Sequence, residues 1–422
     1  MFRRFVTALA AVCACSVLHA SANKHPYTLP SYLPASPAAP AVRPNTEHER
    51  VRPKMVLSEP HDFLKFEAKL DGIYMNGAPF NFKGANYFGM ETDILVPHGL
   101  WGGDQSTTIQ DVATMLKANN FNAVRLPLAV DAVLQNPVLN KYLVQNEVEF
   151  FNKFESTQMT YFDLMDYVID VFAKNNLLVM LDAHRLEAKG EITELWYTSD
   201  VNKDNFESAW RILANRYHDT WNVLGADLKN EPHGAASWGS NDPATDWRLA
   251  ALKWATNIQE ITPRWLIFVE GMQISSRDVP EFGAFWGENL MDVERAQLEL
   301  PVPGRLVYSP HAYGPDVYVQ NYFLNETFPA NMPAIWDLHF GFVHNKYGPL
   351  VPGEWGGKYR TEADKTWQNA FTAYLKEKGL GWFYWCINPN SGDTEGLVEN
   401  DWKTPRADKL AMLSIFEGTP IP

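Results

Sequence analysis

Two glutamates stand at the ends of two apolar, strand-like segments, and together they suggest paired-carboxylate chemistry. Glu231 ends the run LGADLKNE, and Glu354 lies in PLVPGEWGG, 123 positions later. Two carboxyl groups that face each other across a cleft can act as the acid and the nucleophile of acetal cleavage, provided that one is protonated and the other ionised. The fold must therefore bring two distant segments together.

The ends of the other strand-like segments are polar in the same way. Reading only these ends gives Asn86, Tyr87, Arg125, Asp182, His184, Asn230, Glu231, Glu270, His311, Tyr313, Glu354 and Trp385. We expect Arg125 and Tyr313 to keep one carboxyl ionised, because an opposite charge and donated hydrogen bonds lower a carboxyl pKa. Asn230 offers an amide to a sugar hydroxyl. Flat faces on which pyranose rings can stack are available from Trp101, Trp238, Trp286 and Trp385.

A metal site is the alternative interpretation of the same residue types. Its ligands would be His184, Glu231, His311 and Glu354. No short ligand motif such as His-Glu-x-x-His is present, and acetal cleavage by two carboxyls needs no metal. We therefore expect neither a metal ion nor another cofactor.

The elements that position these residues alternate between strands and helices. Eight apolar segments recur on average about 43 residues apart: FNFKGANYFG, FNAVRLPLAV, LLVMLDAH, VLGADLKNEP, WLIFVEG, RLVYSPHAY, PLVPGEWGG and GWFYWCINP. Between them, apolar residues recur with helical spacing, as in STTIQDVATMLKANN and YFDLMDYVIDVFAKNN, with Ser106 to Thr108 available as a cap. Strands that are apolar on both faces and joined by helices predict parallel βα units.

Eight such units predict an α/β fold of the (β/α)8 TIM-barrel class, in which the carboxyl ends of the strands share one mouth. We expect a single catalytic domain over residues 61–422. A doubly wound open sheet is the alternative, but no Gly-x-Gly-x-x-Gly motif follows the first strand, so a dinucleotide site is not supported.

The N-terminal residues have the composition of a leader and a spacer. Residues 1–22 carry Arg3 and Arg4, an apolar run and the pattern Ala20-Ser21-Ala22, which is typical of a cleaved secretory signal peptide. The run is shorter than the about 20 residues of a membrane span. Residues 23–60 are rich in Pro and Ala and predict a disordered spacer or pro-region. We therefore expect a secreted, extracellular protein.

Charge and cysteine content narrow the class of partner. Without Arg3 and Arg4 the chain keeps 34 basic against 50 acidic residues, a net charge of −16. This balance argues against nucleic acid as a partner, because phosphate binding requires a basic face. Of three cysteines only Cys386 lies outside the leader, so the mature chain is expected to form no internal disulfide.

At these residues the chain resembles the retaining glycoside hydrolases of family 5, the cellulase A family. The matching segments run in order from about residue 70 to about residue 403: FGMETDILVPHGLW, FNAVRLP, LDAH, LWYTS, KNEPHG, DWRLAA, LIFVEGMQ, FWGENL, RLVYSPHAYGPDVY, NMPAIWD, GEWGG and NPNSGDTEGL. The resemblance implies a (β/α)8 barrel that hydrolyses β-glycans with retention of configuration.

The resemblance also implies roles for individual residues. Glu231 corresponds to the acid/base and Glu354 to the nucleophile; Arg125 and Tyr313 correspond to residues that contact the nucleophile, and His311 to one near the acid/base. Asn230 corresponds to the group that binds the 2-hydroxyl, and His184 and Trp385 to others that line the same subsite. The loops HGLW and FWGEN are most similar to those of endo-β-1,4-glucanases, which adds His98, Trp101 and Trp286 as expected substrate-binding residues.

Some questions stay open at the level of sequence. β-Mannanase, xyloglucanase and exo-β-1,3-glucanase are alternatives, because these enzymes share the catalytic set and differ in their loops. A secreted, non-catalytic carbohydrate-binding barrel is the alternative from another class. Asp93 stands where some relatives have a cysteine, and we expect no attached cellulose-binding module. We expect a β-glucan substrate and a monomer. Asn325 lies in the one N-glycosylation sequon of the sequence.

Overall fold

A parallel sheet that curls around on itself forms the centre of the computed structural model, which describes residues 64–154, 157–277 and 282–422. In spatial order, its seven strands are β12 (Trp382–Tyr384), β4 (Lys83–Asn86), β5 (Ala123–Ala129), β6 (Leu178–Arg185), β7 (Val223–Asp227), β8 (Leu266–Val269) and β9 (Leu306–Tyr308). The predicted leader and spacer, residues 1–22 and 23–60, lie outside the described residues.

The gap between β9 and β12 is closed by an eighth segment. Tyr308 of β9 bridges Leu350 in parallel, and the backbone N–H of Phe383 donates to Pro352 O at 2.9 Å. The same segment continues into β11 (Glu354–Gly356), which pairs with β10 (His311–Tyr313). All eight predicted segments therefore form the wall, and the (β/α)8 barrel is confirmed over the open sheet.

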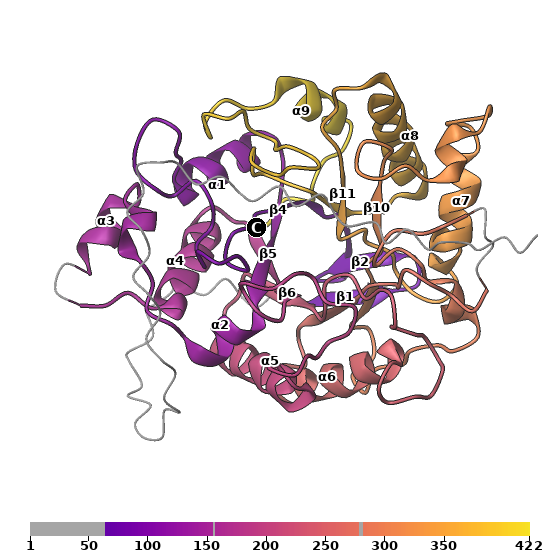
Figure 1. Cartoon of the computed structure of the whole chain (residues 1–422), viewed down its shortest axis with the longest axis horizontal. Helices are drawn as coiled ribbons and strands as arrows, with labels where there is room; N and C mark the ends of the chain where they lie inside the picture. The colour runs from indigo at the N-terminus through magenta and orange to yellow at the C-terminus, as the bar shows by residue number, and fades with distance from the viewer. Residues whose placement is uncertain (1–63, 155–156, 278–281) are drawn as a thin grey trace, which may run out of the picture.

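Helices surround the strands on the outside of the barrel (Figure 1). They are α1 (Ile109–Ala118), α2 (Val130–Gln135), α3 (Val148–Asn152), α4 (Tyr161–Lys174), α5 (Lys203–Tyr217), α6 (Trp247–Ile261), α7 (Met332–His339), α8 (Glu362–Lys378) and α9 (Ala407–Leu413). Four 3-10 helices occur among the described residues, η1 (Lys141–Val144), η2 (Met291–Glu294), η3 (Asn321–Leu324) and η4 (Gly341–Val343). Between β8 and β9, the described residues form η2 and no α-helix.

The two helices read from periodicity are present with the expected buried faces. In α1 the Thr108 side chain accepts from the N–H of Asp111, and Ile109, Val112 and Leu116 are buried. In α4 Thr160 and Asp163 form a reciprocal capping box. Such caps satisfy backbone donors that the first helical turn leaves unpaired.

A small antiparallel sheet, not anticipated from the sequence, covers the amino-terminal end of the barrel. It consists of β1 (Phe66–Lys69), β2 (Gly72–Met75) and β3 (Ala78–Phe80). Asn76 and Gly77 join β2 to β3 with φ values of 52° and 85°, as a two-residue turn with positive φ at both positions requires. This Asn-Gly pair between apolar residues is the sequence signal that could have identified the hairpin.

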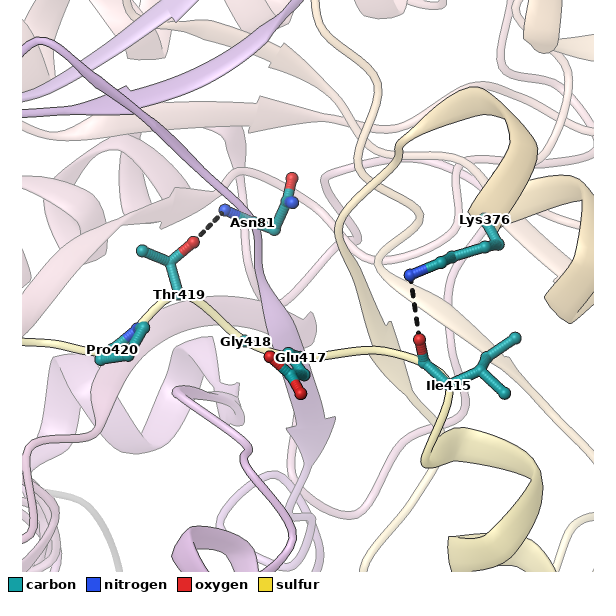
Figure 2. Close-up of a pocket in the computed structure, with 7 residues that line it drawn as sticks. All are labelled: Asn81, Lys376, Ile415, Glu417, Gly418, Thr419 and Pro420. Carbon is teal, nitrogen blue, oxygen red and sulfur yellow. Dashed lines mark hydrogen bonds between the residues drawn. The ribbon is translucent and has the colours of Figure 1, made fainter.

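The C-terminal segment runs across the same end of the barrel. The N–H of Asn81, which precedes β4, donates to Thr419 Oγ1 at 2.8 Å, and Lys376 of α8 donates to Ile415 O at 3.0 Å. Figure 2 shows these contacts around a shallow hollow that the segment Ile415–Pro420 lines. Within the described residues, no helix combines the length and the apolar character that crossing a membrane would require.

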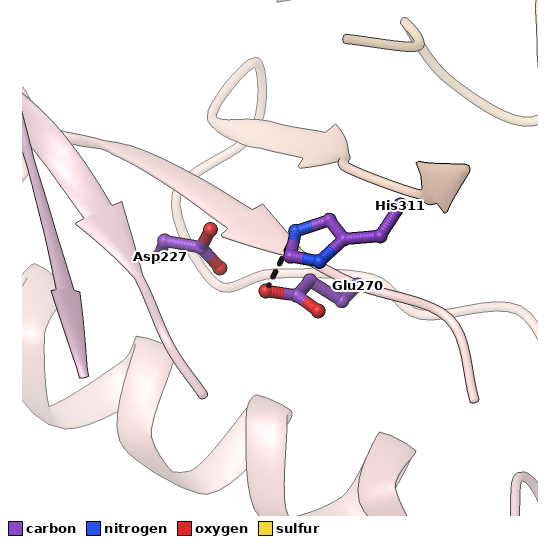
Figure 3. Close-up of side chains that lie close together, drawn as sticks. All are labelled: Asp227, Glu270 and His311. Carbon is purple, nitrogen blue, oxygen red and sulfur yellow. Dashed lines mark ion pairs between the residues drawn. The ribbon is translucent and has the colours of Figure 1, made fainter. Parts of the chain in front are cut away.

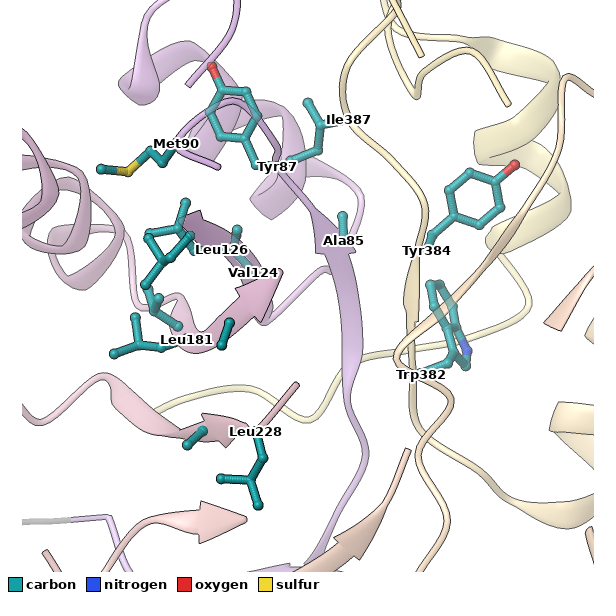
Figure 4. Close-up of a cluster of buried hydrophobic side chains, with 14 of the residues drawn as sticks. Ala85, Tyr87, Met90, Val124, Leu126, Leu181, Leu228, Trp382, Tyr384 and Ile387 are labelled. Carbon is teal, nitrogen blue, oxygen red and sulfur yellow. The ribbon is translucent and has the colours of Figure 1, made fainter. Parts of the chain in front are cut away.

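Alternation along the strands divides the barrel into an apolar floor and a polar mouth. Val124 and Leu126 of β5 belong to the core between sheet and helices, with Leu181 of β6 (Figure 4). Ala123, which precedes them and faces the other way, packs in the barrel interior, and Arg125 comes two residues after it. Because successive side chains point to opposite faces of a strand, each step of two residues moves one layer up the interior.

Candidate active site

Arg125 occupies the centre of the mouth and is completely buried. Its guanidinium lies 2.5 Å from Glu354 Oε1 and donates to Asn86 Oδ1 at 3.0 Å and to Asn230 Oδ1 at 2.9 Å. It also pairs with three further carboxylates, of Asp182 at 3.1 Å, Asp227 at 2.9 Å and Glu270 at 3.2 Å. Burial opposes its charge, but these carboxylates outweigh burial and raise the pKa of Arg125 well above its usual range.

Glu354, at the start of β11, is held as a carboxylate. Tyr313 of β10 donates its hydroxyl to Glu354 Oε2 at 2.5 Å, and His311 Nδ1 lies 3.5 Å from the same oxygen. Burial by itself would raise the pKa of Glu354, but the nearby charges of His311 and Arg125 and the hydrogen bond from Tyr313 lower it below its ordinary value. The expected contacts of Arg125 and Tyr313 with Glu354 are present.

The pKa of Glu231, just beyond β7, is shifted in the opposite direction. Burial raises its pKa, and the charge of Glu354 raises it further against the hydrogen bond from His311, whose Nδ1 lies 3.1 Å from Glu231 Oε1. One oxygen of each glutamate lies within 4.8 Å of the other and of a His311 ring nitrogen. The mouth therefore brings together one carboxyl that favours its proton and one that favours its charge.

Three buried acids extend the cluster beneath this pair. Asp182, Asp227 and Glu270 are completely inaccessible to solvent, and burial raises the pKa of Asp182 to about 7 and that of Asp227 to about 6. Figure 3 shows Asp227 and Glu270 pointing at His311, with Glu270 Oε1 3.2 Å from His311 Nε2. Sequence analysis noted Asp182 and Glu270 at strand ends without assigning them to the site, and it missed Asp227, an acid inside an apolar run.

The geometry also tests whether these acids form a metal centre. Oxygens of Asp227 and Glu270 and a nitrogen of His311 lie within 4.8 Å of one another. However, the Arg125 guanidinium already pairs with both carboxylates, at 2.9 Å and 3.2 Å. The residues present fit an arginine-centred cluster, and the expectation that no metal takes part stays a prediction.

Asn230 and His184 flank the carboxyl pair and have distinct hydrogen-bonding states. Asn230 Oδ1 is taken by Arg125, whereas its buried Nδ2 has no hydrogen-bond partner among the described residues. An unpaired buried donor is costly, so it is suited to a ligand hydroxyl. His184 Nδ1 lies 2.7 Å from Asp182, and burial lowers the pKa of His184 well below its usual value. Its ring is nearly parallel to that of Trp385, with centroids 5.4 Å apart.

The tryptophans expected to flank the cleft differ in exposure. Trp286 is half-buried and stacks on His233, with ring centroids 3.8 Å apart and planes 6° apart. By contrast, Trp101 is 2% exposed; its Nε1 donates to Gln105 O, and it packs edge-on against Trp402. The structure does not place Trp101 as an open sugar platform. Trp238 is also 2% exposed, and its Nε1 donates to Ala296 O.

His98 is buried beside Trp101 and belongs to a separate polar group. Its Nδ1 accepts from Asn390 Nδ2 at 3.0 Å, and its Nε2 lies 3.2 Å from Thr92 Oγ1. Burial lowers the pKa of His98 to about 3, so the ring is neutral. The ring of His98 packs edge-on against Phe88, which stacks on Trp385, and a direct substrate contact of His98 stays a prediction.

Known proteins share both the sequence and the fold. A family model described as cellulase, glycosyl hydrolase family 5, matches residues 74–391. The chain is 40% identical to the major extracellular endoglucanase of Xanthomonas campestris pv. campestris over 347 residues. This stretch covers 82% of this chain and 69% of that protein. It is 37% identical over 341 residues to an endoglucanase of Paenibacillus polymyxa, 80% of this chain and 83% of that protein.

Solved structures agree with these relatives. The catalytic domain of the Xanthomonas campestris endoglucanase is similar with a TM-score of 0.72 and 40% identity, over 80% of this chain and 94% of that domain. A cellotetraose complex of the endocellulase from Pyrococcus horikoshii is similar with a TM-score of 0.75 and 36% identity, over 83% of this chain and 98% of that one. With a family match over more than half of its length and the barrel that carries this site, the chain belongs to glycosyl hydrolase family 5.

Proposed function

We propose that this protein is a retaining endo-β-1,4-glucanase that cleaves internal bonds of β-1,4-glucan. The observation that carries the proposal is the pair of Glu231 and Glu354, whose oxygens lie within 4.8 Å and whose pKa values are moved in opposite directions. Retaining enzymes hold their two carboxyl groups about 5–5.5 Å apart, whereas inverting enzymes leave about 6.5–9.5 Å for a water molecule. The endoglucanases and the cellotetraose complex among the similar proteins support a β-glucan substrate.

In the first step, Glu354 attacks the anomeric carbon and Glu231 donates its proton to the departing glycosidic oxygen. The C–O bond to the leaving sugar breaks as the bond to Glu354 forms, through an oxocarbenium-like transition state. Arg125 and Tyr313 keep Glu354 ionised and aimed, since each contacts a different oxygen of its carboxylate. The unpaired Nδ2 of Asn230 is the donor that we assign to a hydroxyl of the bound sugar.

In the second step, Glu231 accepts a proton from water as that water attacks the glycosyl-enzyme. Glu354 leaves as a carboxylate, and the configuration of the anomeric carbon is retained after two inversions. His311 contacts Glu231 in both steps and lowers the cost of its anionic form after the first proton transfer. His184, Trp385 and Trp286 are assigned to the sugar rings around the cleaved bond.

The remaining parts of the proposal concern location and assembly. The extracellular relative in Xanthomonas campestris and the composition of residues 1–22 support secretion. Both carboxyl groups and their supporting residues come from one chain, which supports a monomer as the active unit.

Product analysis tests the substrate, and covalent labelling tests the mechanism. Rapid loss of viscosity of carboxymethylcellulose, with slow or no release of sugar from glucomannan and laminarin, is the expected result. A 2-deoxy-2-fluoro-cellobioside should label Glu354, and proton NMR should show the β-anomer first. Preferred cleavage of mannan or laminarin would reassign the substrate, and inactivity on every β-glycan would favour a non-catalytic carbohydrate-binding barrel.

A further inference from the structure

We propose that Glu270, at the end of β8, is a positioning residue for Glu231. One of its carboxylate oxygens holds the backbone of Glu231, and the other holds the imidazole that contacts the Glu231 carboxyl. The inference rests on the proposed function, because that function gives Glu231 its role as acid and base.

The first contact fixes the main chain of Glu231. Glu270 Oε2 accepts from the Glu231 N–H at 2.7 Å. Glu231 has a φ of 52°, in the left-handed region that side chains other than glycine rarely adopt. Such a conformation is unfavourable and persists only where its surroundings enforce it. The carboxylate of Glu270 supplies an acceptor at the point where the backbone turns.

The second contact fixes the side-chain end of Glu231. Glu270 Oε1 lies 3.2 Å from His311 Nε2, while His311 Nδ1 lies 3.1 Å from Glu231 Oε1. The ring of His311 therefore lies between the two glutamates, and its contact with Glu270 is an ion pair rather than an aligned hydrogen bond. Glu270 therefore acts on the main chain of Glu231 directly and on its carboxyl through His311, although it touches no position where a substrate would react.

Glu270 is itself held in one place. It is completely buried, its backbone oxygen accepts from Trp247 Nε1 at 2.9 Å, and Arg125 lies 3.2 Å from its Oε1. Gly287 covers it closely, since a Cβ there would come within 2.5 Å of Oε2. The charged groups that face it are Arg125, His311, Asp227 and Lys229. A shorter side chain could not reach both groups, and a glutamine has an acceptor oxygen for only one of them.

The alternative role is that of a simple counter-ion to Arg125, and the chain offers a matched control. Asp227 is equally buried and pairs with Arg125 at 2.9 Å, but none of its hydrogen bonds in the described part of the chain goes to Glu231 or His311. Loss of either carboxyl group removes one buried acid that pairs with Arg125. Only loss of Glu270 releases the acid/base.

The experiment compares Glu270→Gln with Asp227→Asn on two substrates. The kcat/KM for cellotetraose depends on protonation of a sugar leaving group, whereas 2,4-dinitrophenyl β-cellobioside releases a phenolate that needs no proton. General acid catalysis contributes about 10²- to 10⁴-fold, so a misplaced acid should cost about 10- to 100-fold on cellotetraose. We expect less than about 5-fold on the aryl substrate. Asp227→Asn should lower both values by the same factor.

Equal losses on the two substrates in Glu270→Gln, or no loss on either, would overturn the proposal. Glu270→Asp is the second variant: it keeps the charge beside Arg125 but is one methylene shorter, so it should fold and show the same discrimination. If wild-type enzyme cleaves a β-glycan other than cellotetraose, the proposed substrate fails. The comparison then uses that oligosaccharide and its dinitrophenyl glycoside, and the inference about Glu270 is tested independently.

Discussion

Replacing Arg125 with Met removes the cation shared by four buried carboxylates and should destabilise the protein in a pH-dependent way. Breaking a buried ion pair by removing one partner costs about 3–5 kcal/mol. Unfolding entropy of about 2.1 cal/mol/K per residue gives about 0.75 kcal/mol/K for a domain of about 350 residues. The melting temperature at neutral pH should therefore fall by about 4–7 °C.

The pH dependence follows from the direction of the pKa shifts. Burial raises the folded-state pKa of Asp182 to about 7 and that of Asp227 to about 6, against an ordinary value of 3.8, and the charge of Arg125 limits both rises. Without Arg125 these pKa values rise further, so the folded variant binds more protons than the folded wild type. Protonation relieves the repulsion between the buried carboxylates of the variant. The stability of the variant therefore falls as the pH rises through these pKa values. The difference in melting temperature should thus grow from about pH 4.5 to about pH 8.

Calorimetry of the wild type and two variants provides the measurement. Arg264→Met is the control, because Arg264 donates to four backbone carbonyl oxygens, and burial lowers its pKa only to about 10. It should lower the melting temperature by a constant amount between pH 4.5 and pH 8. A constant difference for Arg125→Met over the same range would refute the electrostatic account of the site.

Three further outcomes follow from the same contacts. Tyr313→Phe removes the hydroxyl that donates to Glu354, so the pKa of Glu354 should rise and the acidic limb of kcat/KM should move up by about 1 pH unit; an unmoved limb would count against this role. Glu231→Gln should lower kcat/KM for cellotetraose by about 10²- to 10⁴-fold and spare the dinitrophenyl glycoside, and equal losses would contradict its acid role. Trp286→Ala removes an apolar face worth about 1–2 kcal/mol, so KM should rise about 5- to 30-fold at unchanged kcat, unless the stacked His233 alone binds the sugar.

The sequence alone is sufficient to predict the barrel and the residues at the ends of its strands. Strands of a parallel sheet are buried on both faces and therefore read as continuous apolar segments. Apolar segments with polar ends thus identify the strands of the barrel wall. The small sheet at the amino-terminal end escaped because β1 to β3 have only three or four residues each, too few for a periodic pattern. Its Asn76-Gly77 turn carried the signal instead.

Features that depend on contacts between distant segments were beyond the sequence. Trp101 reads as an exposed platform, yet Trp402, about 300 residues later, covers it. The left-handed backbone of Glu231 has no signature in its residue type. Asp227 does not stand out in the sequence, because it lies just before the polar residues Asn230 and Glu231. Its place in the interior cluster depends on which residues of the strand face inward.

The balance of charge in the mouth explains why a carboxyl there retains a proton. Five carboxyl groups gather around three basic side chains. The acids are Asp182, Asp227, Glu231, Glu270 and Glu354, and the basic side chains are those of Arg125, His311 and Lys229. Low solvent access makes an excess of negative charge costly, so part of the acids must stay neutral. Glu354 favours its ionised form because Arg125 and Tyr313 bind its carboxylate directly. Glu231 is 8% exposed, the most accessible of the five, and can pass its proton to a bound sugar. The buried surplus of acids thus favours the protonated form of Glu231, the carboxyl of this cluster that is most accessible to a substrate.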